Sequence, residues 1–118
     1  MSEFVFLLRS SDAGRREAMG TPEAAQKSLG TWMNWIRGLE ANGSLKNRGI
    51  PLDPKGKVVS GKTPVVVDGP YAEAKDLVLG FLVIEARDID HAVEIAGGCP
   101  IAQGGGAVEV RPVMPMAG

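Results

Sequence analysis

Two continuous apolar runs constrain the fold of this chain more than any other feature. They cover residues 4–8 and 77–84, and only Gly80 interrupts the second run. Runs of this kind, without alternating polar residues, are typical of strands buried on both faces. The chain's own helices can cover one face of such a sheet, so the other face needs a further cover. A second copy of the chain is the economical cover, and we expect a homodimer with two-fold symmetry.

Length and composition narrow the class of protein. A chain of 118 residues with 44% hydrophobic side chains is large enough to form one domain, residues 1–118, without metals or disulfides. The 13 basic and 14 acidic residues are scattered, which argues against direct nucleic-acid binding as the main activity. Because Cys99 is the only cysteine, no intrachain disulfide can form, and a reducing compartment is expected. The sequence has no cluster of His or Cys residues that would indicate a metal site, and we expect no cofactor.

The chain shows no sign of membrane insertion or export. No apolar run approaches the roughly 18 residues that a membrane span needs, and the apolar run at the N-terminus is too short for a signal peptide. We therefore expect a soluble, cytoplasmic protein.

Helix signals follow each of the two apolar runs. Thr21, Pro22 and Glu23 are typical of a helix start, and Asn42-Gly43 of its end. The second helix begins at Asp88 and ends near residues 97–100. The apolar stripe of the first helix consists of Ala25, Leu29, Trp32, Ile36 and Leu39. Gly30 and Gly38 interrupt this helix, and we expect another backbone to pack closely there.

The remaining segments complete an α+β order. Residues 12–20 are polar and contain two glycines, so they are interpreted as a connection with room for a helical turn, and residues 104–106 as a flexible link. A short strand at 44–50, a hairpin formed by 57–59 and 63–67, and a strand at 107–113 are expected. The order is strand, helix, strand with hairpin, strand, helix, strand. This is the ferredoxin-like split βαβ arrangement, βαββαβ with an inserted hairpin.

The turn at residues 68–76 is dense in functional groups. Asp68 ends a strand, a common position for a catalytic group, and a general-base role competes with a simple turn in which its carboxylate accepts backbone N–H bonds. Glu73 and Lys75 either clamp a polar or anionic ligand with help from Tyr71, or pair with Arg111 and Glu109 across the sheet. Arg9 directly follows the first strand. If the alternation of the strand directs its side chain inward, Arg9 adds a cation to the cavity that holds this ligand.

Other reactive side chains have plainer interpretations. His91 is expected on the solvated face of the second helix. Cys99 is placed at a helix end, where nothing lowers its thiol pKa. Trp32 and Trp35 are interpreted as core residues.

Residues 68–76, with Gly80-Phe81 and the segment 108–113, resemble the DGPF-domain branch of the YCII-related family. The resemblance implies a dimeric α/β-barrel of ferredoxin-like subunits. Some relatives resemble small-molecule enzymes with a His-Asp pair, and others are linked to transcription initiation. This chain departs from the family's usual sequence motif at Tyr71, Ala74 and Asp76. Its only histidine, His91, lies in the second helix and not near the first strand.

Two functional hypotheses follow. In the first, a cofactor-free homodimer holds a small polar or anionic molecule in a cavity between its sheets, with Asp68 and Lys75 as candidate catalytic residues and Arg9, Tyr71, Glu73 and Arg111 as ligand-binding residues. Turnover as a lyase, isomerase or hydrolase, or binding alone, stays open. In the second, the protein is a regulatory partner of the transcription machinery that acts through protein contacts.

Overall fold

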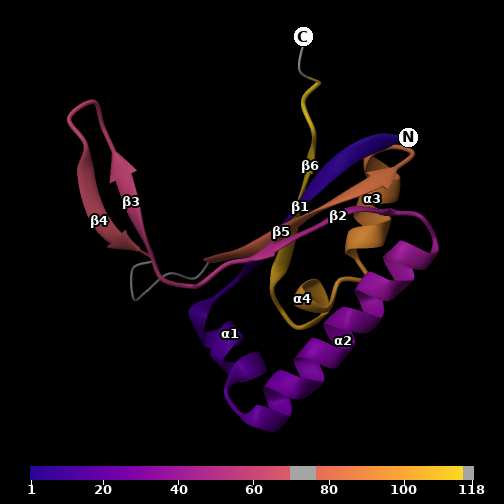
Figure 1. Ribbon diagram of the computed structural model, residues 1–118, viewed down its shortest axis with the longest axis horizontal. Helices are drawn as coiled ribbons and strands as arrows, with labels where there is room; N and C mark the ends of the chain where they lie inside the picture. The colour runs from indigo at the N-terminus through magenta and orange to yellow at the C-terminus, as the bar shows by residue number, and fades with distance from the viewer. Residues whose placement is uncertain (70–76, 116–118) are drawn as a thin grey trace.

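The computed structural model describes residues 1–69 and 77–115. A four-stranded antiparallel sheet has the order β2-β5-β1-β6, and β3 and β4 pair separately as a two-stranded hairpin (Figure 1). The elements are β1 (Ser2–Ser10), α1 (Asp12–Met19), α2 (Pro22–Ala41), β2 (Leu45–Pro51), β3 (Gly56–Ser60), β4 (Val65–Gly69), β5 (Leu77–Ala86), α3 (Ile89–Ala96), α4 (Pro100–Gln103) and β6 (Ala107–Pro112).

The α+β class expected from the sequence is confirmed, and the strand order is consistent with a ferredoxin-like fold. The two apolar runs form the central strands β1 and β5, which pair along their whole length from Ser2 opposite Ala86 to Ser10 opposite Leu77. The hairpin and the short strand β2 also form where the sequence predicts them. Within the described residues, no helix is long and apolar enough to cross a membrane.

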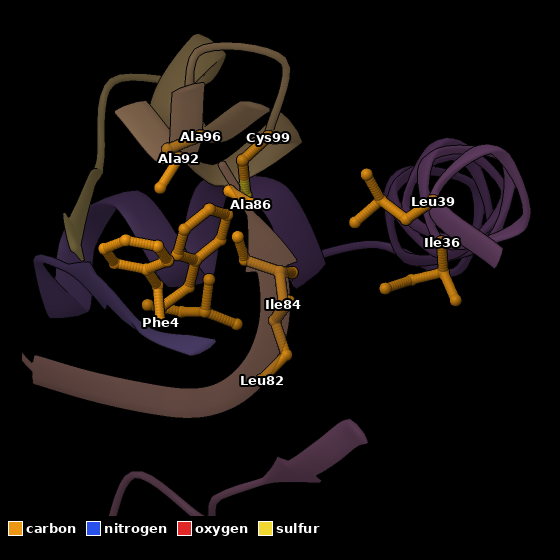
Figure 2. Packing of buried hydrophobic residues seen from close by; sticks show 11 residues of the cluster. Phe4, Ile36, Leu39, Leu82, Ile84, Ala86, Ala92, Ala96 and Cys99 are labelled. Atoms are coloured by element: carbon orange, nitrogen blue, oxygen red, sulfur yellow. The ribbon is translucent and has the colours of Figure 1, made fainter. Parts of the chain in front are cut away.

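The core lies on one face of the four-stranded sheet (Figure 2). Alternate side chains of β1 and β5 point towards the helices, and Phe6, Leu82 and Ile84 are completely buried there. Ala92 and Ala96 bring α3 close to these strands, because small side chains permit a short distance between helix and sheet. Val108 and Val110 of β6 pack against the same cluster, as the alternation of that strand predicts.

Only the C-terminal half of α2 packs on the core. Thr21 caps the helix by accepting a hydrogen bond from the backbone N–H of Ala24 at 3.0 Å, as expected for a helix start. Ile36 and Leu39 are buried and point towards the sheet (Figure 2), whereas Leu29 is 59% exposed. The predicted stripe is therefore helical throughout, but its N-terminal half lies beyond the core.

Residues 12–20, interpreted from the sequence as a connection with room for a helical turn, form a longer element than that, the helix α1 over Asp12–Met19. Ser11 caps the helix by accepting a hydrogen bond from the backbone N–H of Gly14 at 2.9 Å. The Ser28 hydroxyl of α2 donates to the carbonyl of Ala18 at 2.9 Å and ties the two helices together. A good cap and contact with α2 outweigh the polar composition that suggested a loop.

The segment after α3 also differs from the prediction. Cys99 does not end a helix but is the N-cap residue of the short helix α4. The glycines that follow are not only a link, since a Cβ on Gly106 would lie 2.6 Å from the carbonyl oxygen of Arg9. Gly106 thus permits close approach of this turn to β1.

The β3–β4 hairpin stands apart from the rest of the molecule (Figure 1). Val59 and Val66 pair on one face of it, and they are 63% and 55% exposed. The Cα radius of gyration is 15.8 Å, compared with about 13.5 Å expected for a compact domain of this length. The chain is therefore more extended than a self-contained domain.

Glycines in α2 and β2 have opposite roles. A Cβ added to Gly30 or Gly38 would meet no atom of the described residues within 4 Å, so the close backbone packing expected from the sequence at these positions is wrong. In contrast, Gly49 has a φ of +65°, and its Cβ would lie 1.6 Å from the carbonyl oxygen of Phe81. Gly49 allows the irregular pairing of β2 with β5 between Asn47 and Ile50.

These environments predict stability changes of opposite sign. We expect Gly30→Ala and Gly38→Ala each to raise the free energy of unfolding by about 0.5–1 kcal/mol, because alanine fits the open space and favours the helix. We expect Gly49→Ala to lower it by at least about 2 kcal/mol, because of the strained φ and the backbone clash. Urea unfolding measures all three, and a destabilised Gly30→Ala variant would contradict the placement of Gly30 on an open helix surface.

Candidate functional site

The face of the four-stranded sheet opposite the core has an apolar centre. It consists of two cross-strand pairs, Val5 with Val83 and Leu7 with Phe81, which we call the open face. All four side chains are half-buried, although the helices pack on the other side of the sheet. The sequence predicted that both faces of these strands are covered. The described residues cover only the face on which the helices pack.

A row of alternating charges borders the open face along β1 and β6. Arg9 forms an ion pair with Glu109, and the Arg111 Nε atom lies 3.7 Å from the other carboxylate oxygen of Glu109. Strand register explains the row, because Leu7 pairs with Glu109 and Val5 with Arg111, so both charged residues of β6 lie on the open face. Arg9 and Glu109 are about one third exposed at 33% and 34%, whereas Arg111 is 67% exposed.

The structure thus brings together two of the predicted ligand-binding residues, Arg9 and Arg111, around one carboxylate. The row carries two positive charges and one negative charge, and its most exposed member is a guanidinium that can donate two parallel hydrogen bonds to an anion. The predicted pairing of Glu73 and Lys75 with Arg111 and Glu109 involves two residues outside the described part of the chain. Among the described residues, the partners of Glu109 are Arg9 and Arg111. Chemically, the row places two guanidinium groups and one carboxylate beside an apolar surface.

Asp68 lies on the hairpin and not beside this row in the pairings observed. Its carboxylate accepts a hydrogen bond from the Lys57 Nζ atom at 2.7 Å across the strand pair, and its side chain is 88% exposed. The contact is thus a cross-strand ion pair, where the sequence suggested backbone N–H groups as the plainer partner. Tyr71, Glu73 and Lys75 lie outside the described residues.

His91 has a structural contact at the start of α3. Its backbone N–H donates to the Asp88 carboxylate at 2.8 Å, and its Nδ1 atom accepts the backbone N–H of Arg87 at 3.1 Å. This reciprocal arrangement satisfies two backbone donors at the helix start. Across residues 1–69 and 77–115, no three His, Cys, Asp or Glu side chains gather closely enough to hold a metal ion.

Two opposing influences act on the pKa of the buried Cys99 thiol. Burial raises its pKa above the ordinary value, and the backbone N–H groups of Ile101 and Ala102 lower it by a smaller amount. The side chain has no exposed surface. Burial therefore decides the outcome, and the thiol stays protonated although it begins a helix.

A cavity that the sequence did not predict lies on the helix side of the molecule. It has a volume of about 520 Å³ and is bounded by α1, α2 and α4 together with the ends of β1 and β5. We call it the helix pocket. Trp32, expected only in the core, forms part of its wall and contacts Trp35 with a ring-centroid distance of 5.3 Å. The sequence feature that could have indicated this pocket is the apolar stripe of α2, which extends further along the helix than the core does.

Comparison with known proteins identifies the family. A YCII-related domain matches residues 4–117, almost the whole chain. The chain belongs to the YCII-related family. The resemblance inferred from the residues is thereby confirmed at the level of the family.

A relative of this YCII-related protein is an uncharacterized protein of Rhizobium meliloti (strain 1021). The two are 40% identical over 50 residues, which are 42% of this chain and 40% of the relative. The match thus spans about two fifths of that protein's length, and its name assigns no activity.

The buried thiol gives a prediction for the response to pH. Because the pKa of Cys99 is higher in the folded state than in the unfolded state, the unfolded thiol ionises first as the pH rises. We expect the free energy of unfolding to fall above the ordinary thiol pKa, and we expect this fall to be shallower in Cys99→Ala. Urea unfolding from neutral to alkaline pH measures the difference.

A thiol reagent provides the control. We expect Cys99 to resist Ellman's reagent in the folded protein and to react completely in denaturant. Rapid reaction of the native protein would contradict the burial of this side chain.

Proposed function

We propose that this YCII-related protein is a homodimer, of the DGPF branch, that binds a small polar or anionic molecule between two facing sheets. The observation that carries the proposal is the open face, where an apolar centre adjoins the Arg9–Glu109–Arg111 row. An apolar centre with a charged rim is the usual anatomy of a protein interface. In this arrangement two sheets close a barrel, and the charged rows lie at its mouth.

The exposed area of the chain supports a partner. The accessible surface is 8284 Å², whereas a folded monomer of 12.4 kDa is expected to expose about 6,100 Å². The difference of about 2,200 Å² exceeds the roughly 800 Å² that each partner contributes to a standard interface. The open face and the hairpin both have apolar surface that a partner could cover.

The charges favour a small anion as ligand. Arg111 is two thirds exposed and shares the Glu109 carboxylate with Arg9, so its guanidinium keeps donors for a carboxylate or phosphate. A partner sheet would remove water from this region and strengthen the interaction. In the proposal, Lys75, Tyr71 and Glu73 complete the ligand shell, and Lys75 would supply an acid–base group if the bound molecule is turned over. Asp68, which pairs with Lys57 on the hairpin, is not part of this shell.

A second candidate function rests on the hairpin. Val58, Val59, Val65 and Val66 expose at least half of their surface on a two-stranded ribbon that is marginal by itself in water. A protein partner that covers these valines fits a regulatory role in transcription, which needs no ligand cavity. The two proposals differ in the surface that they require.

Substitutions in the open face and in the hairpin distinguish the two proposed functions. We expect the parent protein to sediment at twice the chain mass of 12.4 kDa at micromolar concentration. We expect Leu7→Glu to weaken the dimer about a hundredfold or more, because the new carboxylate would be desolvated without a partner. The hairpin variant Val59→Glu is the matched control and should remain dimeric.

Circular dichroism checks that Leu7→Glu still folds, and Phe81→Glu tests the same face from the neighbouring strand. A parent protein that is monomeric throughout the accessible concentration range would refute the facing-sheet arrangement. Dissociation by Val59→Glu but not by Leu7→Glu would assign the interface to the hairpin.

Ligand binding is tested by thermal shifts with a panel of small carboxylates and phosphates. We expect at least one compound to raise the melting temperature of the parent protein and to have a smaller effect on Arg111→Gln and Lys75→Ala. Arg37→Gln, an exposed charge removal on α2, is the control and should respond like the parent. Equal shifts in all four proteins would remove Arg111 and Lys75 from the site.

A further inference from the structure

We infer that the helix pocket is a second binding site, for an amphipathic carboxylate with an aliphatic body and one anionic head. The site is separate from the open face and does not depend on the proposed function. Most of its residues come from α1, α2 and α4, which lie on the helix side of the sheet (Figure 1), and Ser10, Leu52 and Leu79 add to the lining.

The walls of the helix pocket contain large apolar side chains that the fold leaves uncovered. Met19, Leu29 and Leu52 are 51%, 59% and 46% exposed, although they come from three different segments of the chain. The half-buried side chains of Trp32, Leu79 and Ile101 line the pocket further and connect it to the core. Exposed apolar side chains that converge on a concave surface are typical of ligand sites.

The polar groups of the interior are largely engaged. The Ser28 hydroxyl donates to the Ala18 carbonyl at 2.9 Å, and the Thr31 hydroxyl donates to the Lys27 carbonyl at 3.0 Å. These hydroxyl protons are therefore not available to a polar ligand. The interior suits a hydrocarbon body, and the volume of about 520 Å³ lies within the range of small-molecule sites.

The charges that line the helix pocket are both positive. Arg15 and Lys27 contribute to it, and the described lining contains no Asp or Glu. Neither cation has an ion pair with another described residue, so their charges can be offered to a ligand. Arg15 is half-buried, which strengthens its attraction for an anion relative to a fully solvated cation. Charge complementarity thus selects an anionic head over a neutral or cationic one.

Three probes of equal chain length test this assignment by isothermal titration calorimetry with the full chain. They are decanoate, decanol and decyltrimethylammonium, each used below its aggregation concentration. We expect decanoate to bind with one site per chain, decanol to bind more weakly, and decyltrimethylammonium to bind most weakly. Absence of decanoate binding, or equal binding of the three, would overturn the proposal.

Variants locate the site. We expect the double variant Arg15→Gln and Lys27→Gln to weaken decanoate about tenfold and to leave decanol nearly unchanged. We expect Leu29→Gln to weaken decanoate and decanol alike by about threefold to tenfold, and its exposed position leaves the core intact. Arg37→Gln, on the same helix but outside the pocket, should bind like the parent.

Arg111→Gln distinguishes this site from the open face. We expect it to bind decanoate like the parent protein. If Arg111→Gln abolished decanoate binding while Leu29→Gln had no effect, the probe would occupy the open face, and the assignment of the helix pocket would be wrong. Ala18→Phe offers an independent check, because a ring at this exposed position of the wall should fill the cavity and reduce binding of decanoate and decanol.

Discussion

The pairing of β1 with β5 is the interaction on which the rest of the structure depends. It joins the two most apolar segments of the chain in the centre of the sheet and presents their side chains in alternation to both faces. Phe6, Leu82 and Ile84 therefore bury completely against the helices, while Leu7 and Phe81 are left half-buried on the open face. The same pairing makes a core and leaves an apolar surface that needs a cover, which is the physical basis of the proposed dimer.

The helices also leave part of their apolar surface uncovered by the sheet. A helix of 20 residues, α2, is longer than the core beneath it, so Ile36 and Leu39 pack on the sheet while Leu29 extends past it. Helix α1 then lies against this extension, tied by the bond from Ser28 to Ala18. The apolar part of α2 that the sheet does not reach becomes a wall of the helix pocket. The helix pocket and the open face thus have the same cause: more apolar surface than one chain of this length can bury.

Much of this fold is predictable from local patterns, and the exceptions have physical reasons. The caps at Thr21 and Asp88 and the apolar runs depend on neighbouring residues, so the sequence predicted them. The full length of helix α1 was not predicted, because its stability comes from a cap at Ser11 and from contact with α2, which polar composition does not reveal. The start of α4 at Cys99 was missed because Pro100 signals both a helix end and a helix start. The charged row was predicted in part, since Arg9 and Arg111 were named, while their shared carboxylate depends on strand register.

Contact between two open faces is the central claim, and NMR of a mixed sample tests it most directly. One set of chains would carry labelled Leu and Val methyl groups, the other would be unlabelled, and intermolecular nuclear Overhauser effects would be recorded. We expect these effects at the methyl groups of Val5, Leu7 and Val83, which lie on the open face. Intermolecular effects confined to the hairpin valines Val59 and Val66, or absent altogether at concentrations well above micromolar, would contradict it.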